Sequence, residues 1–181
     1  MNNVDLYDAA VDRWEKCIDL PAPTYLSAAV ATEDGQQVYV TGGITEYTNG
    51  TNFLLFDVRS SRWNSLGDLP QPRYGHAAIM DAEGYRLYVI GGITSAVEPH
   101  SVAEYDLRSA KWRHLASGGD LTHYGVTAVR GPDDIIYALA HRVRSIQRFD
   151  PKQEKWLPNG PPACSRFFKP LVLSSCLIAR A

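Results

Sequence analysis

The apolar residues of the chain fall into short runs that are separated by glycine, aspartate or serine. In one stretch, apolar runs cover 74–80 and 86–90, an alternating run covers 101–105, and a fourth run covers 111–115. These runs are rich in β-branched and aromatic residues, which favours β-strands. No segment shows the i, i+3, i+4, i+7 apolar spacing of an amphipathic helix. The pattern therefore predicts an all-β chain, and we name the four successive strands a, b, c and d.

The pattern also repeats with a fixed period. The sequence Tyr-Val-Thr-Gly-Gly-Ile-Thr at 39–45 returns as Tyr-Val-Ile-Gly-Gly-Ile-Thr at 88–94, a step of 49 residues. Trp14, Trp63 and Trp112 keep the same step. When 24–66 is laid on 73–115 without a gap, 15 of the 43 positions are identical. A period of this size predicts stacked copies of one supersecondary unit.

We expect one domain over 1–181, built from three complete units and two half units. The complete units cover about 24–69, 73–118 and 123–158, and the half units cover 4–20 and 163–181. The third unit is degenerate, because Ala140-His141 stands where the other units have two glycines. Its b–c loop is also about five residues shorter. In all four copies that include strands c and d, a tryptophan follows an aspartate after six residues, which predicts equivalent packing positions for Trp14, Trp63, Trp112 and Trp156.

The repeat resembles the kelch motif. Its signature is a strand that ends in Gly-Gly, then an aromatic-Asp pair, then a tryptophan six residues after that aspartate, as in Gly42-Gly43, Phe56-Asp57 and Trp63. The resemblance implies a kelch-type β-propeller, in which each repeat is a blade of four antiparallel strands around a central channel. We therefore expect about four blades or an open arc of blades.

Two arrangements of the chain ends remain open at this stage. The half units are complementary, since 4–20 supplies strands c and d while 166–173 and 176–181 supply strands a and b. They could pair into one composite blade and close a four-bladed ring. Alternatively, the chain is a piece of a longer propeller, which is the simpler explanation.

Charge and composition exclude several classes of function. The formal net charge is −2, which gives no general attraction to nucleic acid or to an anionic membrane. No apolar run reaches the length of a membrane span, and the first residues lack the pattern of a signal peptide. Cys17, Cys164 and Cys176 show neither metal-ligand spacing nor a disulfide framework. We therefore expect a cytoplasmic protein with no cofactor and no metal.

Candidate binding residues follow from the resemblance, which implies that partners dock on the face formed by the d–a and b–c loops. Register places Tyr25, Tyr74 and Tyr124 at the ends of the d–a loops, with Arg73 and His123 beside two of them. Tyrosine has a stiff apolar body and a polar tip, which suits recognition. The alternative is that these tyrosines pack between blades as part of the repeat.

The shortened third b–c loop contains the one local cluster of positive charge, with Arg142 and Arg144. Arginines on this rim would suit an acidic or phosphorylated peptide, whereas the alternative is an ordinary solvated loop. His76 lies within strand a, where we expect a buried, hydrogen-bonded histidine rather than a catalytic one.

Two functions follow from these residues. The first is a protein-interaction module that binds a peptide or protein partner, with no enzymatic activity, because no catalytic or phosphate-binding motif is present. Such proteins often serve as scaffolds or as substrate adaptors of ubiquitin ligases. The alternative is a carbohydrate-binding or sugar-acid-isomerising kelch enzyme, for which Arg73, His76 and His123 are the only candidates for a charged centre.

Overall fold

The computed structural model describes residues 2–46, 50–94, 100–121, 125–141, 145–158 and 179–180. The strands are β1 (Asp5–Asp8), β2 (Arg13–Lys16), β3 (Ala28–Ala31), β4 (Gln37–Thr41), β5 (Asn52–Asp57), β6 (Arg62–Asp68), β7 (Ala77–Met80), β8 (Arg86–Ile90), β9 (His100–Asp106), β10 (Lys111–Ser117), β11 (Thr127–Arg130), β12 (Ile136–Leu139), β13 (Gln147–Asp150), β14 (Lys155–Leu157) and β15 (Ala179–Arg180). The described residues form no helix, so the all-β prediction is confirmed. Accordingly, these residues contain no helix that is long and apolar enough to cross a membrane.

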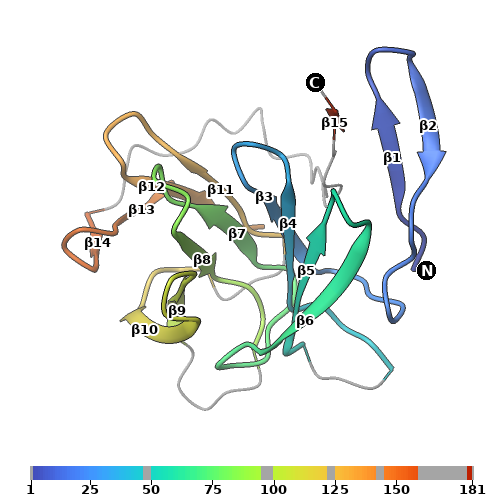
Figure 1. Cartoon of the computed structure of the whole chain (residues 1–181). Helices are drawn as coiled ribbons and strands as arrows, with labels where there is room; N and C mark the ends of the chain where they lie inside the picture. Colours follow the sequence, from blue (N-terminus) through green and yellow to red (C-terminus); the bar gives the residue numbers. More distant parts are fainter. Residues whose placement is uncertain are drawn as a thin grey trace.

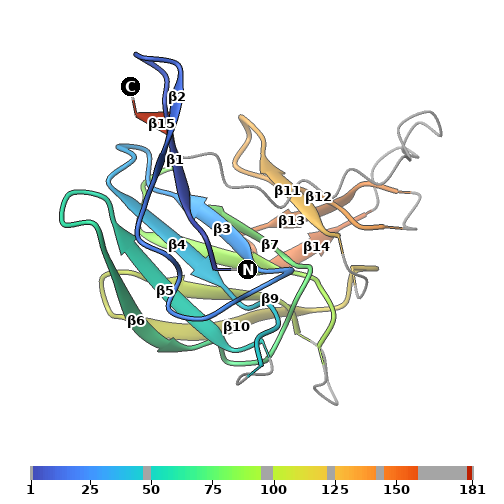
Figure 2. The same cartoon turned by 90° about the vertical axis from the view of Figure 1, so that its right-hand side faces the viewer.

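Three four-stranded antiparallel sheets contain most of the chain. They are β3–β6, β7–β10 and β11–β14, each paired in sequence order. The a strands β3 and β11 both contact β7, so the three sheets stand side by side along their inner edges. Figures 1 and 2 show the sheets following one another in an open arc, with hairpin β1–β2 near one end and β11–β14 at the other. The blades of the expected propeller are therefore present, but the sheets of the described residues do not close into a ring.

The chain ends meet differently from the composite blade that complementarity suggested. Ala179 and Arg180 in β15 pair with Tyr7 and Asp8 in β1, but in parallel. In the complete sheets strand b runs antiparallel to strand c, because a short loop connects the two. No such loop joins β15 to β1, so nothing in the chain imposes that direction.

Every c–d turn adopts the same conformation. The first residue of each turn is an aspartate whose Oδ1 accepts backbone N–H groups two or three residues further on; for Asp106 these are the N–H groups of Arg108 and Ser109, at 2.8 and 2.9 Å. The fourth residue after each aspartate has a left-handed backbone although it is not glycine: Asp12, Ser61, Ala110 and Glu154, with φ between 50° and 53°. The aspartate bonds hold this turn.

Each turn also places an aromatic pair across strands c and d. Tyr7 faces Trp14, Phe56 faces Trp63, Tyr105 faces Trp112 and Phe149 faces Trp156, with ring centroids 4.8–5.4 Å apart. The four tryptophans therefore occupy equivalent positions in their hairpins, as predicted, but only Trp63, Trp112 and Trp156 also pack against a core cluster. Cross-strand aromatic pairs of this kind stabilise a sheet.

Within the described part of the chain, the hydrophobic core consists of three clusters, one at each contact between successive sheets. We call the face that carries the aromatic pair the leading face of a sheet. We call the opposite face, which carries Val30 and Tyr39 or Ile79 and Tyr88, the trailing face. The leading face of β7–β10 and the trailing face of β3–β6 share one cluster, and β11–β14 and β7–β10 share another in the same way. Burial between sheets, rather than within one, thus holds the fold together.

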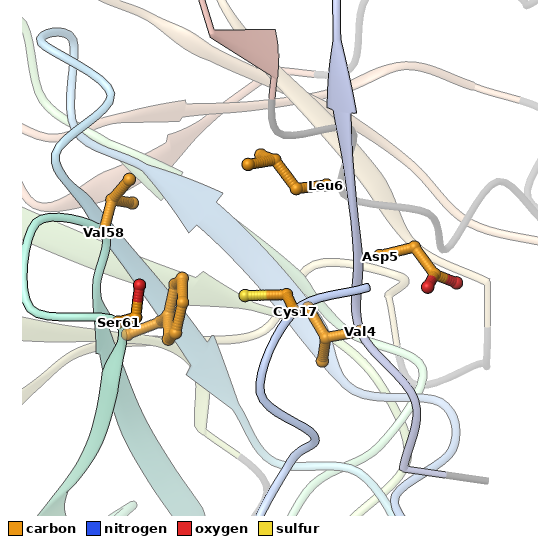
Figure 3. Close-up of a pocket in the computed structure, with 7 residues that line it drawn as sticks. Val4, Asp5, Leu6, Cys17, Val58 and Ser61 are labelled. Carbon is orange, nitrogen blue, oxygen red and sulfur yellow. The ribbon is translucent and has the colours of Figure 1, made fainter. Parts of the chain in front are cut away.

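The contact between hairpin β1–β2 and the first sheet is the smallest of the three. Its cluster has three buried members, Val38, Phe56 and Val58, with Cys17 and Trp63 packed against them. A small cavity of about 20 Å³ remains between the two elements, and the Cys17 side chain points into it from the hairpin side (Figure 3). This contact is therefore less completely packed than a full contact between blades.

A buried carboxylate links the second and third sheets. Glu104 is only 2% exposed, and it lies beside Arg113 on β10 and Tyr88 on β8. The Arg113 guanidinium donates to Glu104 at 2.8 Å and to Glu154, in the β13–β14 turn, at 2.6 Å. The two carboxylates raise the pKa of Arg113, and burial together with Glu104 raises the pKa of Tyr88 to about 12. Arg86 is close enough to interact with both Tyr88 and Glu104.

Arg113→Ala should lower the free energy of unfolding by about 1–3 kcal/mol, because it leaves Glu104 buried without its main partner. The loss stays below that of a fully buried ion pair, since Arg113 is half-exposed and Arg86 remains nearby. Glu154→Ala, which removes only the exposed partner, should cost at most about 1 kcal/mol. Urea unfolding of both variants tests this, and equal losses would contradict it.

Candidate functional site

The described parts of the d–a and b–c loops lie on one edge of the arc, which we call the loop face. They are residues 17–27, 69–76, 118–121 and 125–126 of the d–a connections, and residues 42–46, 50–51, 91–94, 140–141 and 145–146 of the b–c connections. Backbone hydrogen bonds join these loops to each other and to the next repeat. Gly43 N–H donates to the Arg73 carbonyl at 3.0 Å, Arg73 N–H donates to Gly50, and Gly92 N–H donates to Leu121. The described loops therefore rest on a fixed base rather than projecting freely.

The Gly-Gly pairs explain why the backbone segments beneath the loop face lie so close together. Both glycines of each pair have positive φ, which ranges from 59° to 87°. A Cβ on Gly42 would overlap the Arg73 carbonyl and the His76 ring, and a Cβ on Gly91 would lie 2.8 Å from the Leu121 carbonyl. The glycines therefore let the end of strand b approach the following d–a loop and the start of the next repeat.

Two of the predicted tyrosines are fixed at corresponding places on the loop face. Tyr25 exchanges two backbone hydrogen bonds with Ile44, and Tyr74 exchanges two with Ile93. The Tyr25 side chain is 59% exposed, whereas Tyr74 is partly buried. Four other predicted binding residues, His123, Tyr124, Arg142 and Arg144, lie outside the residues that the structure describes.

Arg73 lies beneath the loop face rather than on it. Its side chain is 1% exposed, and Nη1 donates to the Gly91 carbonyl at 3.1 Å. Burial lowers the pKa of Arg73 to about 10, so the guanidinium keeps its charge at neutral pH. It therefore supports the junction of the first two repeats from inside.

His76 is buried and hydrogen-bonded, which confirms the expectation from its place in the sequence. It is 4% exposed, and Nε2 lies 2.8 Å from the Thr41 hydroxyl of the preceding sheet. Burial, and secondarily the Arg73 charge, lower the pKa of His76 to about 3. The imidazole is therefore neutral at physiological pH. Neither His76 nor Arg73 is open to a dissolved sugar in this structure.

The rim of the loop face carries a feature that sequence reasoning missed. Asp19, Asp68 and Asp120 lie at or just after the end of strand d in successive copies, and each is followed by leucine. Asp68 and Asp120 are exposed and Asp19 is partly buried. The repeated Asp-Leu pair was visible in the sequence and could have located this row of carboxylates.

The repeated sheets and their loop face define a propeller-type repeat protein. Residues 84–119 match the family model described as the kelch motif, and this match runs from the a–b turn through β8, β9 and β10. This stretch of the chain therefore carries a kelch motif, in agreement with the sequence signature. No curated protein sequence matches the chain. Kelch motifs generally mediate protein–protein interactions, which supports a protein-interaction module.

Proposed function

We propose that the chain is a recognition platform that binds a peptide or protein partner through the loop face. One observation carries the proposal: Tyr25 presents most of its side chain to solvent from a backbone that Ile44 holds on both sides. A stiff aromatic on a rigid base loses little entropy when a partner covers it. Tyr74 occupies the same place in the next repeat, and Tyr124 corresponds to both in the sequence.

The proposal extends to the charge of the partner. Arg142 and Arg144 stand in the third b–c loop of the sequence and would attract an acidic segment, with His123 beside Tyr124 as a further contact. Arg73 contributes from below by holding the junction between repeats. In this scheme the platform performs no chemistry; it acts as a scaffold or substrate adaptor in the cytoplasm.

Tyr25→Ala should weaken binding by about 30-fold or more, the usual effect of truncating an aromatic binding hot spot. The partner is represented by peptides that are selected from a random displayed library on the immobilised full chain. Their affinities are then measured by calorimetry for the native protein and for the variants. Tyr85→Ala is the matched control, because Tyr85 is a 43% exposed aromatic in an a–b turn, away from the loop face.

The two loop sets give opposite outcomes in this experiment. Loss of affinity in Tyr25→Ala with retention in Tyr85→Ala supports the loop face, and the reverse result would move the working surface to the a–b turns. If the selected peptides are acidic, Arg142→Glu with Arg144→Glu should also weaken binding and flatten its salt dependence.

A further inference from the structure

The contacts between successive sheets all use equivalent residues. On the leading face, Trp63 packs in the same cluster as Cys17 at the end of the hairpin, and its indole donates to the carbonyl of Ile18, just after the hairpin, at 3.0 Å. The Trp112 ring lies 5.1 Å from Phe53 of the first sheet, and Trp156 joins the cluster of the second sheet that contains Val102. A tryptophan on a leading face thus meets the trailing face of the sheet before it in all three cases.

Two faces of the described structure lack such a neighbour. Trp14, on the leading face of hairpin β1–β2, is 58% exposed, whereas its three counterparts are partly buried. Val129, on the trailing face of β11–β14, is 63% exposed, although its counterparts Val30 and Ile79 pack against core clusters. Among the described residues, neither Trp14 nor Val129 belongs to a core cluster.

These two faces are the two halves of one more contact of the same kind. The repeat register predicts what Trp14 would meet: Ile146 lies ten residues before Trp156, as Phe53 lies ten before Trp63. Phe53 is the residue that Trp112 contacts in the complete interface. In the same way, Tyr39 and Tyr88 are 4% and 2% exposed where a following sheet covers them, whereas Tyr137 on the uncovered face is only partly buried.

The two faces cannot meet within one copy of this arc, because the hairpin and the third sheet lie near opposite ends (Figures 1 and 2). We propose that they meet between copies: the leading face of the hairpin of one copy packs on the trailing face of β11–β14 of a second copy. The contact is head to tail, so it closes into a ring when the rotation permits. Two copies would supply six four-stranded sheets and two hairpins, a total within the four to eight blades of known propellers.

The test compares the self-association of the full chain and its variants by sedimentation over a wide range of protein concentration. The native chain should form a two-copy species. Trp14→Arg and Val129→Arg, which change opposite halves of the contact, should each raise the dissociation constant by about 30-fold or more. Tyr85→Arg, an exposed aromatic on neither face, should leave it unchanged. Denaturant unfolding of each variant at low concentration checks that the fold is intact, since Trp14 and Val129 are already largely exposed.

Mixing the two interface variants gives the sharpest result. A Trp14→Arg copy keeps an intact trailing face, and a Val129→Arg copy keeps an intact hairpin face, so the mixture should recover one good contact and form a mixed pair. A contact that used the same face of both copies would give no recovery on mixing. Failure to recover association on mixing would overturn the proposal. So would a native chain that is monomeric at all concentrations, or a dissociation constant that neither substitution changes.

Discussion

Gly42→Ala should lower the free energy of unfolding by about 2–5 kcal/mol. Two costs combine here. An alanine at φ +59° adopts a left-handed backbone, which costs about 1–2 kcal/mol. Its Cβ would also meet the Arg73 carbonyl and the His76 ring, and overpacking of this kind costs about 1–3 kcal/mol more. Because the first contact is backbone, no rotamer change relieves it.

Gly35→Ala separates the two costs. Gly35 has nearly the same φ, +64°, but nothing lies within 4 Å of the Cβ position. Its substitution should therefore cost only the backbone part, about 1–2 kcal/mol. Urea unfolding of the two variants measures the difference. Equal losses would show that the junction beneath the loop face has room to move.

The stability of the protein should fall as the pH drops from about 6.5, because of His76. In the unfolded chain this imidazole titrates near its ordinary pKa of about 6.5, whereas in the fold its pKa is lowered to about 3. The neutral form therefore stabilises the fold fully above pH 6.5, and this contribution is lost as the pH falls toward 3. The slope is about 1.4 kcal/mol per pH unit, so a fall from pH 6.5 to pH 4.5 lowers the free energy of unfolding by about 2.7 kcal/mol.

The window between pH 6.5 and 4.5 isolates this effect from the carboxylates. The pKa values of Asp34, Asp57, Asp106 and Asp134 are lowered by their hydrogen bonds or ion pairs, so their contribution disappears only at lower pH. His76→Gln keeps a polar group near Thr41 but cannot take up a proton. Urea midpoints of this variant should be flatter with pH than those of the native chain. Parallel profiles would show that His76 is not the group responsible.

The strands and turns were predictable because their signals are local and occur several times. The six-residue step from Asp57 to Trp63 recurs in every c–d hairpin, so the same pattern predicted the strands and the turn in all four copies. The equivalent strand positions of the four tryptophans followed from the same step. Because the copies could be compared with one another, the repeats indicated which positions are structurally equivalent, which a single unrepeated sequence does not show.

The burial of Arg73 was not predictable in this way. It follows Pro72 in a loop, which is a setting typical of a solvated side chain. What covers it comes from distant backbone, since Gly50 and Gly91 approach it only once two repeats are stacked. Likewise, the exposure of Trp14 depends on which sheet packs against its face, and among the described residues none does; local sequence does not contain that information.

The left-handed residue of each c–d turn has a consequence for how such a chain can change over time. Aspartate, serine, alanine and glutamate all adopt the same backbone there, because the aspartate that begins the turn and the aromatic pair behind it impose the conformation. The backbone conformation at the tips of these hairpins therefore does not depend on which side chain occupies the left-handed position. Mutational drift can alter the chemistry of this outer edge one residue at a time while the spacing between blades stays constant.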